Sequence, residues 1–401
     1  MLERFDRDSV IHLLSELVKI KSPYFEENEV MAFADKWLRE NGLDSSIFEY
    51  SEDKVVHFHG KDVIVPLKGD HPGPKVCLNG HLDTVNLCSG WTRNPWGELD
   101  GDRFYGVGAL DMTGGAVAEM LAMKAFRDQF GNDFSGEILG TFVSDEEGPY
   151  GLGTNALIEA GLLDGVDVSV CCEPNAAFAG VSFPSVALGA RGGYGLWIEV
   201  HGAAAHASKP YEGINAVEDA AAVIREIGNV EYRKDPKLGS GVYCVLGLES
   251  NDNACSVPDY AKIHLFRHTI TGETPETIRS ELVDAIARAH IRSQWKIIFR
   301  EAPSEGSAGF MPYTVDENHP YTKLFLQCAE TACGVRPSVS YFDSIGDFNY
   351  LGSRLHGAPV FLFGPNGEKF HGSDEYVTIS TIQATARTLY EFLVKVLTSR
   401  T

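Results

Sequence analysis

Basic residues are scarce in this chain of 401 residues, in which 34 Lys and Arg face 56 Asp and Glu. The formal net charge of -22 repels nucleic acids and anionic membrane surfaces, so we expect no nucleic-acid partner. Apolar runs of membrane-spanning length are absent, and residues 1–6 (MLERFD) are too polar and acidic to open a signal peptide. We therefore expect no membrane attachment, a cytoplasmic location and a small-molecule substrate.

Cysteine pairs of the Cys-x-x-Cys type are also missing, although the chain has eight cysteines. They are scattered among mostly apolar neighbours, which is typical of reduced core residues. Cys171-Cys172 is the one pair that suggests a nucleophile, but it ends the apolar segment 168–172, so we expect both side chains to be buried.

The length exceeds that of a usual single domain, so we expect two domains. Apolar periodicity predicts an α/β pattern of helices and buried strands, with strands at 46–50, 63–67, 76–85, 136–143, 168–172 and 359–363 and helices at 8–19, 27–41, 116–130 and 321–333. The block 186–299 differs, because its strands and helices predict an α+β insertion with a sheet of its own. The α/β pattern, predicted to resume near Trp295, gives a main domain of residues 1–185 and 300–401.

The segment Val76 to Val85 is an apolar run that ends in His81 and Asp83. Side chains two apart on an extended strand point the same way, so Asp83 can reach the far ring nitrogen of His81. A carboxylate in that place fixes a metal-binding imidazole, although a surface-facing strand end would show the same pattern.

Further acids follow other predicted strands and turns. Asp111 ends a glycine-rich turn, Glu146 and Glu147 follow the strand 136–143, and Glu173 follows the strand 168–172. Ligands bind at the carboxyl ends of the strands in an open α/β sheet, so these side chains are expected to converge. A solvated acidic turn is the alternative for Glu146 and Glu147.

Histidine and carboxylate ligands without a thiolate are typical of divalent zinc, with Co2+ or Mn2+ as substitutes. One carboxylate shared by two ions would place them ~3.5–4 Å apart, as in two-metal hydrolases. The sequence thus favours a metal centre at the strand ends.

Six motifs occur in an order and spacing that resemble the M20 metallopeptidase family: His81-Leu82-Asp83, Gly106 to Gly115, Asp145-Glu146-Glu147, Glu173-Pro174, Gly202-x-x-x-His206 and His371-x-x-x-Glu375. That family includes acetylornithine deacetylase, succinyl-diaminopimelate desuccinylase, aminoacylase-1 and glutamate carboxypeptidase. The resemblance implies a zinc-exopeptidase-like catalytic domain with a central mixed sheet flanked by helices, plus an inserted α+β lid and dimerisation domain.

By this resemblance two divalent metal ions, Zn2+ foremost, would be held by five residues. His81 and Glu173 would hold one ion, Glu147 and His371 the other, and Asp111 would bridge them.

The resemblance also implies roles around the ions. Asp83 would orient His81, and Glu146 would be the general base that takes a proton from the attacking water and passes it to the leaving amine. The peptide Asp111-Met112 would be cis, as is typical of the family.

In the lid, His206 would reach the active site of the partner subunit in a homodimer and stabilise the oxyanion, although a histidine in a small-residue turn is the alternative. Arg267 would pair with the substrate carboxylate, together with backbone N–H groups of the loop at Gly364.

Departures from the family pattern affect the substrate rather than the metal ligands. Ser256 stands where an asparagine is usual, with Asn253 nearby as a stand-in, and the loop 343–347 differs from the usual Gly-Gly-Thr/Ser-Asp. Arg191 fits a hinge-side ion pair and a substrate contact equally well.

These observations favour a two-metal amidohydrolase that acts on a small carboxylate-bearing N-acyl amino acid, of deacetylase or desuccinylase type. A dipeptidase or carboxypeptidase of the same family is the alternative. A catalytically idle metal- or amino-acid-binding protein and an aminopeptidase without a lid are further readings.

Overall fold

The computed structural model describes residues 5–251 and 254–398 and divides into two compact units. The first comprises Met1–Ala190 and Tyr313–Thr401, and the second comprises Arg191–Pro312. These boundaries differ from the 186 and 299 expected from sequence. The strand Ser185–Ala190 belongs to the sheet of the first unit, and the segment after 299 stays on the second, where Phe310 pairs with Gly193.

The first unit is built on a nine-stranded sheet. Its order is β1 (Ser46–Glu52), β2 (Phe58–Lys68), β6 (Ser135–Val143), β3 (His71–His81), β7 (Val168–Cys171), β17 (Val360–Leu362), β8 (Ser185–Ala190) and β15 (Tyr313–Thr314), with β16 (Ser338–Phe342) beside β8. Strands β6, β3, β7 and β17 are parallel, whereas β1, β2, β8 and β15 pair antiparallel. The sheet is therefore mixed, as predicted.

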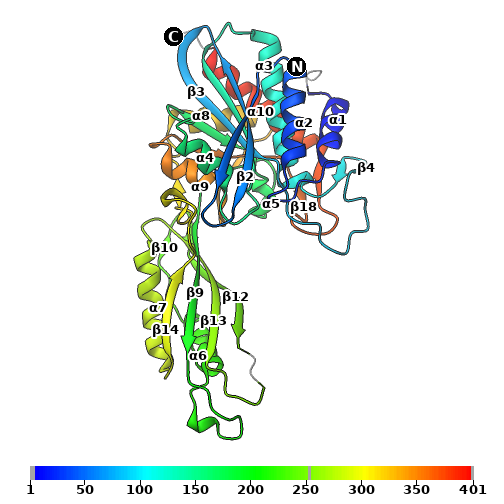
Figure 1. Cartoon of the computed structure of the whole chain (residues 1–401). Helices are drawn as coiled ribbons and strands as arrows, with labels where there is room; N and C mark the ends of the chain where they lie inside the picture. The colour runs from blue at the N-terminus through cyan, green and yellow to red at the C-terminus, as the bar shows by residue number, and fades with distance from the viewer. Residues whose placement is uncertain (1–4, 252–253, 399–401) are drawn as a thin grey trace. The chain divides into compact units, whose positions relative to one another are not determined.

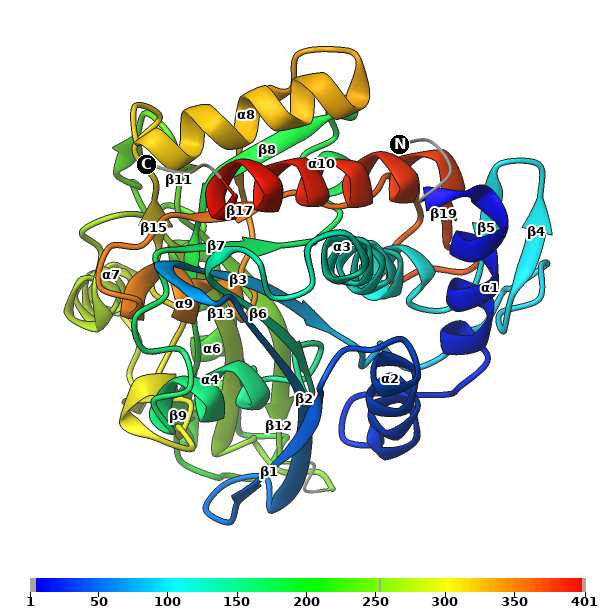
Figure 2. The same ribbon diagram turned by 90° about the horizontal axis from the view of Figure 1, so that it is seen from above.

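Helices cover this sheet on both faces. Figure 2 shows α3 (Gly114–Phe130), α8 (Pro320–Cys333) and α10 (Ile379–Leu397) in one layer, with α1 (Arg7–Val18) packed beside α3 and α10. Helices α4 (Leu152–Glu159) and α9 (Phe348–Arg354) lie on the opposite face of the sheet and contact each other. Helix α2 (Asn28–Glu40) packs on β2, and the single-turn helix α5 (Asn175–Phe178) follows β7. None of the helices in the described part of the chain is long and apolar enough to cross a bilayer.

The central strands are apolar because both of their faces are covered. In β3 the last six residues are all buried, ending at His81. Parallel strands between two helix layers are typically near-continuous apolar runs, each large side chain contributing about 1.5–3 kcal/mol on burial. A polar residue at the end of such a strand is therefore held in a rigid and dry environment.

A small four-stranded sheet brings the C-terminal ligand segment to the glycine-rich turn. Its order is β18 (Gly367–Glu368), β19 (Tyr376–Thr378), β5 (Arg103–Tyr105) and β4 (Glu98–Asp100). Tyr376 pairs with Tyr105, so the residue before β19 lies opposite the residue after β5. Residues far apart in sequence are thereby held in register.

The second unit has its own antiparallel sheet, ordered β12 (Val242–Ser250), β13 (Tyr260–Thr269), β9 (Gly192–His201) and β14 (Gln294–Phe299) (Figure 1). Helices α6 (Ala216–Ile227) and α7 (Pro275–Ala289) share its apolar core. The segment at Trp295 was expected to resume the α/β pattern, but it forms β14 and pairs with β9.

Candidate metal centre

His81 is placed at the end of β3 with its ring 1% exposed. Its Nδ1 lies 3.0 Å from the backbone oxygen of Asp83 and 3.4 Å from the Asp83 carboxylate. Its Nε2 faces oxygens of Asp111, Glu146 and Glu173 at 3.6, 3.8 and 3.8 Å. That nitrogen is buried and has no hydrogen-bond partner among the described residues, which fits a metal-coordinating position.

The carboxylate of Asp111 faces two imidazoles. Its Oδ1 lies 3.6 Å from Nε2 of His81, and its Oδ2 lies 3.2 Å from Nε2 of His371. One oxygen toward each histidine is the arrangement that a bridging carboxylate requires. The peptide Asp111-Met112 is cis, as the family resemblance implied.

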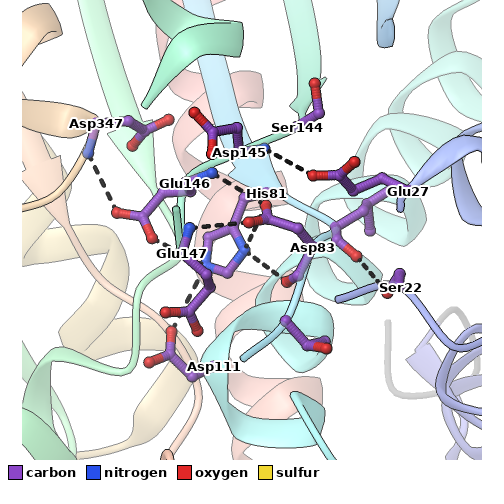
Figure 3. Close-up of polar contacts among 12 residues, drawn as sticks. Ser22, Glu27, His81, Asp83, Asp111, Ser144, Asp145, Glu146, Glu147 and Asp347 are labelled. Atoms are coloured by element: carbon purple, nitrogen blue, oxygen red, sulfur yellow. Dashed lines mark hydrogen bonds and ion pairs between the residues drawn. The ribbon is translucent and has the colours of Figure 1, made fainter. Parts of the chain in front are cut away.

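Glu147 completes the second side of the centre, with an oxygen 2.9 Å from Nε2 of His371. The ligand atoms of His81, Glu146 and Glu173 all lie within 4.8 Å of one another. The same holds for those of His81, Asp111 and Glu147. Figure 3 shows His81 among Asp83, Asp111, Glu146 and Glu147. The structure thus brings together the five ligands expected from sequence and the expected base.

Asp83 does more than was expected from sequence. Its carboxylate accepts backbone N–H groups of Glu146 at 3.2 Å and Glu147 at 2.8 Å, as Figure 3 shows. Glu27 accepts the N–H of Asp145 at 3.1 Å. The buried carboxylates of Glu27 and Asp83 therefore hold the backbone of the turn 145–147. Glu27 carries no sequence signal of this contact, which depends on the tertiary fold.

The carboxylate of Glu146 is oriented by the loop before α9. Its Oε1 accepts the backbone N–H of Asp347 at 3.2 Å. A Cβ at Gly346 would lie 2.7 Å from the same oxygen, so the loop approaches as closely as a glycine allows. Asp347 was expected to influence only the substrate, and sequence alone gave no sign of this contact.

Burial and mutual repulsion raise the pKa of three carboxyls in the centre, whereas the two histidines lower that of Asp111. Burial and the charge of Asp111 raise the pKa of Glu147 to about 7 and that of Glu173 well above its usual range. Burial raises the pKa of Glu146 in the same way, opposed by His81. Several carboxyls that resist ionisation together favour a bound cation.

The pKa values of the two histidines are raised as well, which for an imidazole favours the charged form. Hydrogen bonds that the ring of His371 donates to the carboxylates of Asp111 and Glu147 raise the pKa of His371 to about 11. Burial would lower the pKa of His81, but Asp111 and Asp83 raise it well above its usual value. Both shifts come from the acids that surround the rings, whose charges a bound cation would balance.

The donor set fits a pair of divalent ions. It offers imidazole nitrogens and carboxylate oxygens without a thiolate, which suits Zn2+ with an open position for a substrate. The buried and unpartnered Nε2 of His81 supports this fit, because an imidazole nitrogen is costly to leave unpaired.

His206 and Ser256 lie together in the second unit, where their backbones form an antiparallel bridge. The ring Nδ1 of His206 lies 2.8 Å from Oγ of Ser208 and accepts the N–H of Ser208 at 3.1 Å. Asn253 lies outside the described residues.

Arg267 does not fit the substrate-binding role expected from sequence. Its guanidinium is fully buried, 3.1 Å from Glu273 and 2.8 Å from Glu281, and lies over the ring of Tyr243. These partners occupy its donors, so Arg267 stabilises the second unit. The signal was present in the sequence: Ile263 and Leu265 alternate in phase with Arg267 and mark the buried face of β13.

The loop at Gly364 packs on the strand end that carries Glu173. A Cβ at Gly364 would lie 2.0 Å from the backbone oxygen of Cys172, so only glycine fits there. The N–H of Asn366 in the same loop is donated to Thr381. Arg191 donates to the backbone oxygen of Leu238 at 2.8 Å, a contact inside the second unit.

Comparison with known proteins identifies the family. The model of peptidase family M20/M25/M40 matches residues 77–395, which include every candidate ligand. The chain belongs to this family. It is accordingly a hydrolase of the M20 metallopeptidase type, acting on peptide or amide bonds.

Relatives of this M20 chain cover nearly its whole length. Succinyl-diaminopimelate desuccinylase of Sulfurovum sp. is 23% identical over 382 residues, which span 94% of this chain and 95% of that protein. The crystal structure of aminopeptidase PepT from Bacillus cereus superposes with a TM-score of 0.77 at 16% identity, over 98% of this chain and 99% of that one.

Two further structures share the M20 fold. The dipeptidase Dug1p of Saccharomyces cerevisiae has a TM-score of 0.77 at 14% identity, over 98% of this chain and 97% of that one. The YXEP protein of Bacillus subtilis, a dinuclear metal binding peptidase, has a TM-score of 0.67 at 17% identity, over 98% and 99% of the two chains. At these identities the solved structures show the fold.

Proposed function

We propose that this M20 hydrolase is a two-metal amidohydrolase that releases an amino acid from a small N-acyl amino acid with a free carboxylate. The observation that carries the proposal is Asp111, whose two oxygens face His81 and His371 on opposite sides. His81 and Glu173 would hold one ion, and Glu147 and His371 the other. When bound, such ions polarise the scissile carbonyl and acidify the attacking water.

Glu146 is suited to move the proton. Burial raises its pKa well above that of a free carboxyl, which makes it a stronger base. The N–H of Asp347 fixes one oxygen, so the other, Oε2, is left facing the centre near His81. Glu146 takes the proton of the water and delivers it to the leaving amine.

Replacing Glu146 with Ala tests this role. We expect turnover to fall by about 10²–10⁴-fold, because the neighbouring carboxylates of Asp111, Glu147 and Glu173 would be occupied as metal ligands. Metal content should stay close to that of the wild type. Glu49→Gln, an exposed carboxylate on β1, is the control and should keep full activity. Substantial turnover by Glu146→Ala would refute the assignment of the base.

The substrate class is the finer part of the proposal. Several relatives that span the chain are named desuccinylases, which supports an N-acyl amino acid. Solved structures of the same fold are named as peptidases and dipeptidases, which keeps a dipeptide as the second candidate. Assays of N-acetyl, N-succinyl and N-formyl amino acids against dipeptides, with Zn2+, Co2+ and Mn2+, separate the two. A protein stabilised by amino acids that consumes none of these substrates would be an idle binder.

A homodimer through the second unit is part of the same proposal. Strand β12 is the edge of its sheet and exposes apolar side chains, with Leu246 65% exposed and Leu248 42% exposed. An edge strand with apolar side chains favours association with another copy. In such a dimer His206 of one chain would serve the active site of the other. The free cysteines fit the reducing cytoplasm in which we place the reaction.

A further inference from the structure

Glu375 is a buried carboxylate to which the proposed reaction gives no role. It is 1% exposed and stands four residues after His371, directly before β19. The pairing of β19 with β5 places it opposite Gly106, whose N–H donates to the backbone oxygen of Glu375 at 3.1 Å. Its side chain therefore lies against the turn that ends in Asp111.

Three backbone N–H groups of that turn converge on the Glu375 carboxylate. Oε2 accepts the N–H of Gly108 at 3.1 Å, and Oε1 accepts those of Leu110 at 2.9 Å and Asp111 at 3.1 Å. Gly108 has a φ of +69°, and a Cβ there would lie 2.2 Å from Thr84, so the turn depends on glycine. Successive N–H groups in such a turn form a concave anion-binding nest.

The turn sets the direction of the Asp111 side chain. The two carboxylate oxygens of Asp111 lie 3.6 Å from the ring of His81 and 3.2 Å from that of His371. A small rotation of the turn would therefore bring Asp111 closer to one histidine and farther from the other. Glu375 accepts the backbone N–H of Asp111 and belongs to the same segment as His371. A single side chain thus links a ligand shared by both metal positions to a ligand of one.

We propose that Glu375 is a positioning residue that sets the Asp111 turn against the His371 segment and so couples the occupancy of the two metal positions. The inference rests on the proposed two-metal function. Groups that orient metal ligands typically change metal affinity by 10–100-fold when removed, without touching the ion.

The chain supplies a matched control in Glu52. Its carboxylate, 8% exposed, also accepts three backbone N–H groups, from Lys54 at 2.8 Å, Val55 at 2.9 Å and Val56 at 2.7 Å. That turn carries none of the candidate ligands. Glu52→Gln therefore reproduces the loss of a carboxylate on backbone N–H groups without disturbing the metal centre.

Zinc binding by the full-length protein tests the proposal. Glu375→Gln places an amide NH2 against N–H donors, so we expect its affinity for Zn2+ in competition with a chelator to fall by about 10–100-fold. Its kcat should fall while KM changes little. Glu52→Gln should bind Zn2+ like the wild type even where it is less stable to urea. Wild-type Zn2+ affinity and kcat in Glu375→Gln would overturn the proposal.

Amide hydrogen exchange on the metal-free wild type gives a second test that needs no variant. The amides of Gly108, Leu110 and Asp111 should be protected without metal, because Glu375 holds them. Exchange at unprotected rates would overturn the proposal. If the wild type binds no pair of Zn2+ ions, the proposed function fails. If it binds two and Glu375→Gln binds two with unchanged affinity, only the role of Glu375 fails.

Discussion

At the scale of single residues, several buried carboxylates near the candidate metal centre accept hydrogen bonds from backbone N–H groups. The carboxylate of Asp83 lies beside the ring of His81 and accepts the backbone N–H groups of Glu146 and Glu147. The same carboxylate therefore contacts two candidate ligands, His81 and Glu147, and the proposed base, Glu146.

Asp83→Asn should consequently affect more than the His81 side. The amide keeps one acceptor oxygen, so one of the two N–H groups loses its partner and the acidic turn shifts. We expect Zn2+ affinity to fall by about 10–100-fold and kcat to fall with it. Chelator competition and steady-state kinetics measure both. Two ions bound at wild-type affinity with unchanged activity would contradict this role for Asp83.

Metal binding should release protons at neutral pH. The pKa of His371 is raised from 6.5 to about 11 by Asp111 and Glu147, so its ring is protonated in the metal-free protein and must lose that proton to coordinate. The ion pair of the protonated ring with Asp111, whose pKa lies below its usual value, stabilises the metal-free fold fully below pH 6.5, and this contribution is lost as the pH rises through 11. Zn2+ affinity should therefore increase with pH.

Calorimetric titration of Zn2+ in buffers of different ionisation enthalpy counts the released protons. His371→Gln, which has no ring to deprotonate, is the control and should release fewer. Binding heats that do not depend on the buffer would show that His371 is already neutral in the metal-free protein.

At the scale of helices and strands, the edge strand β12 carries the proposed association. Leu246→Lys places a charge where the proposed partner strand would lie, so we expect a monomer in sedimentation. If His206 acts on the partner's site, activity should fall with the dimer. Leu99→Lys, an equally apolar exposed position on β4, is the control and should stay dimeric and active. A Leu246→Lys dimer of wild-type activity would rule out β12 as the interface.

The elements were predictable where local apolar periodicity decides them. The strand ending at His81 and the helix after Asp111 were found, because burial on both faces leaves a continuous apolar run. Strand β14 lies within the predicted block 186–299 but was not predicted as one of its strands, because its pairing with β9 is set by contacts distant in sequence. Helix α10 was not predicted at all.

The residues of the candidate metal centre were predictable from the sequence, but the contacts that hold them in place were not. Side chains at strand ends converge by topology, so His81 and Glu173 could be named from the sequence. The contacts of Glu27 and Glu375 could not, because a carboxylate on backbone N–H groups depends on the packing of distant segments. Arg267 was misassigned although its place in the alternation of β13 marked it as buried.

At the scale of the whole molecule, the first unit holds the complete set of candidate ligands, and His206 lies in the second unit. The first unit also contains the cluster of acids around His81, formed by Asp111, Glu146, Glu147 and Glu173, whose charges two cations would balance. The family membership and the geometry of Asp111 lead to the same account, a hydrolase whose centre is assembled by two ions.

Titration of the chelator-stripped protein with Zn2+ tests that account most directly, with bound metal and hydrolysis of N-acyl amino acids followed together. We expect two ions to bind per chain and activity to be restored with them. A chain that saturates with one ion or none, or that hydrolyses its substrate fully after stripping, would contradict the two-metal centre.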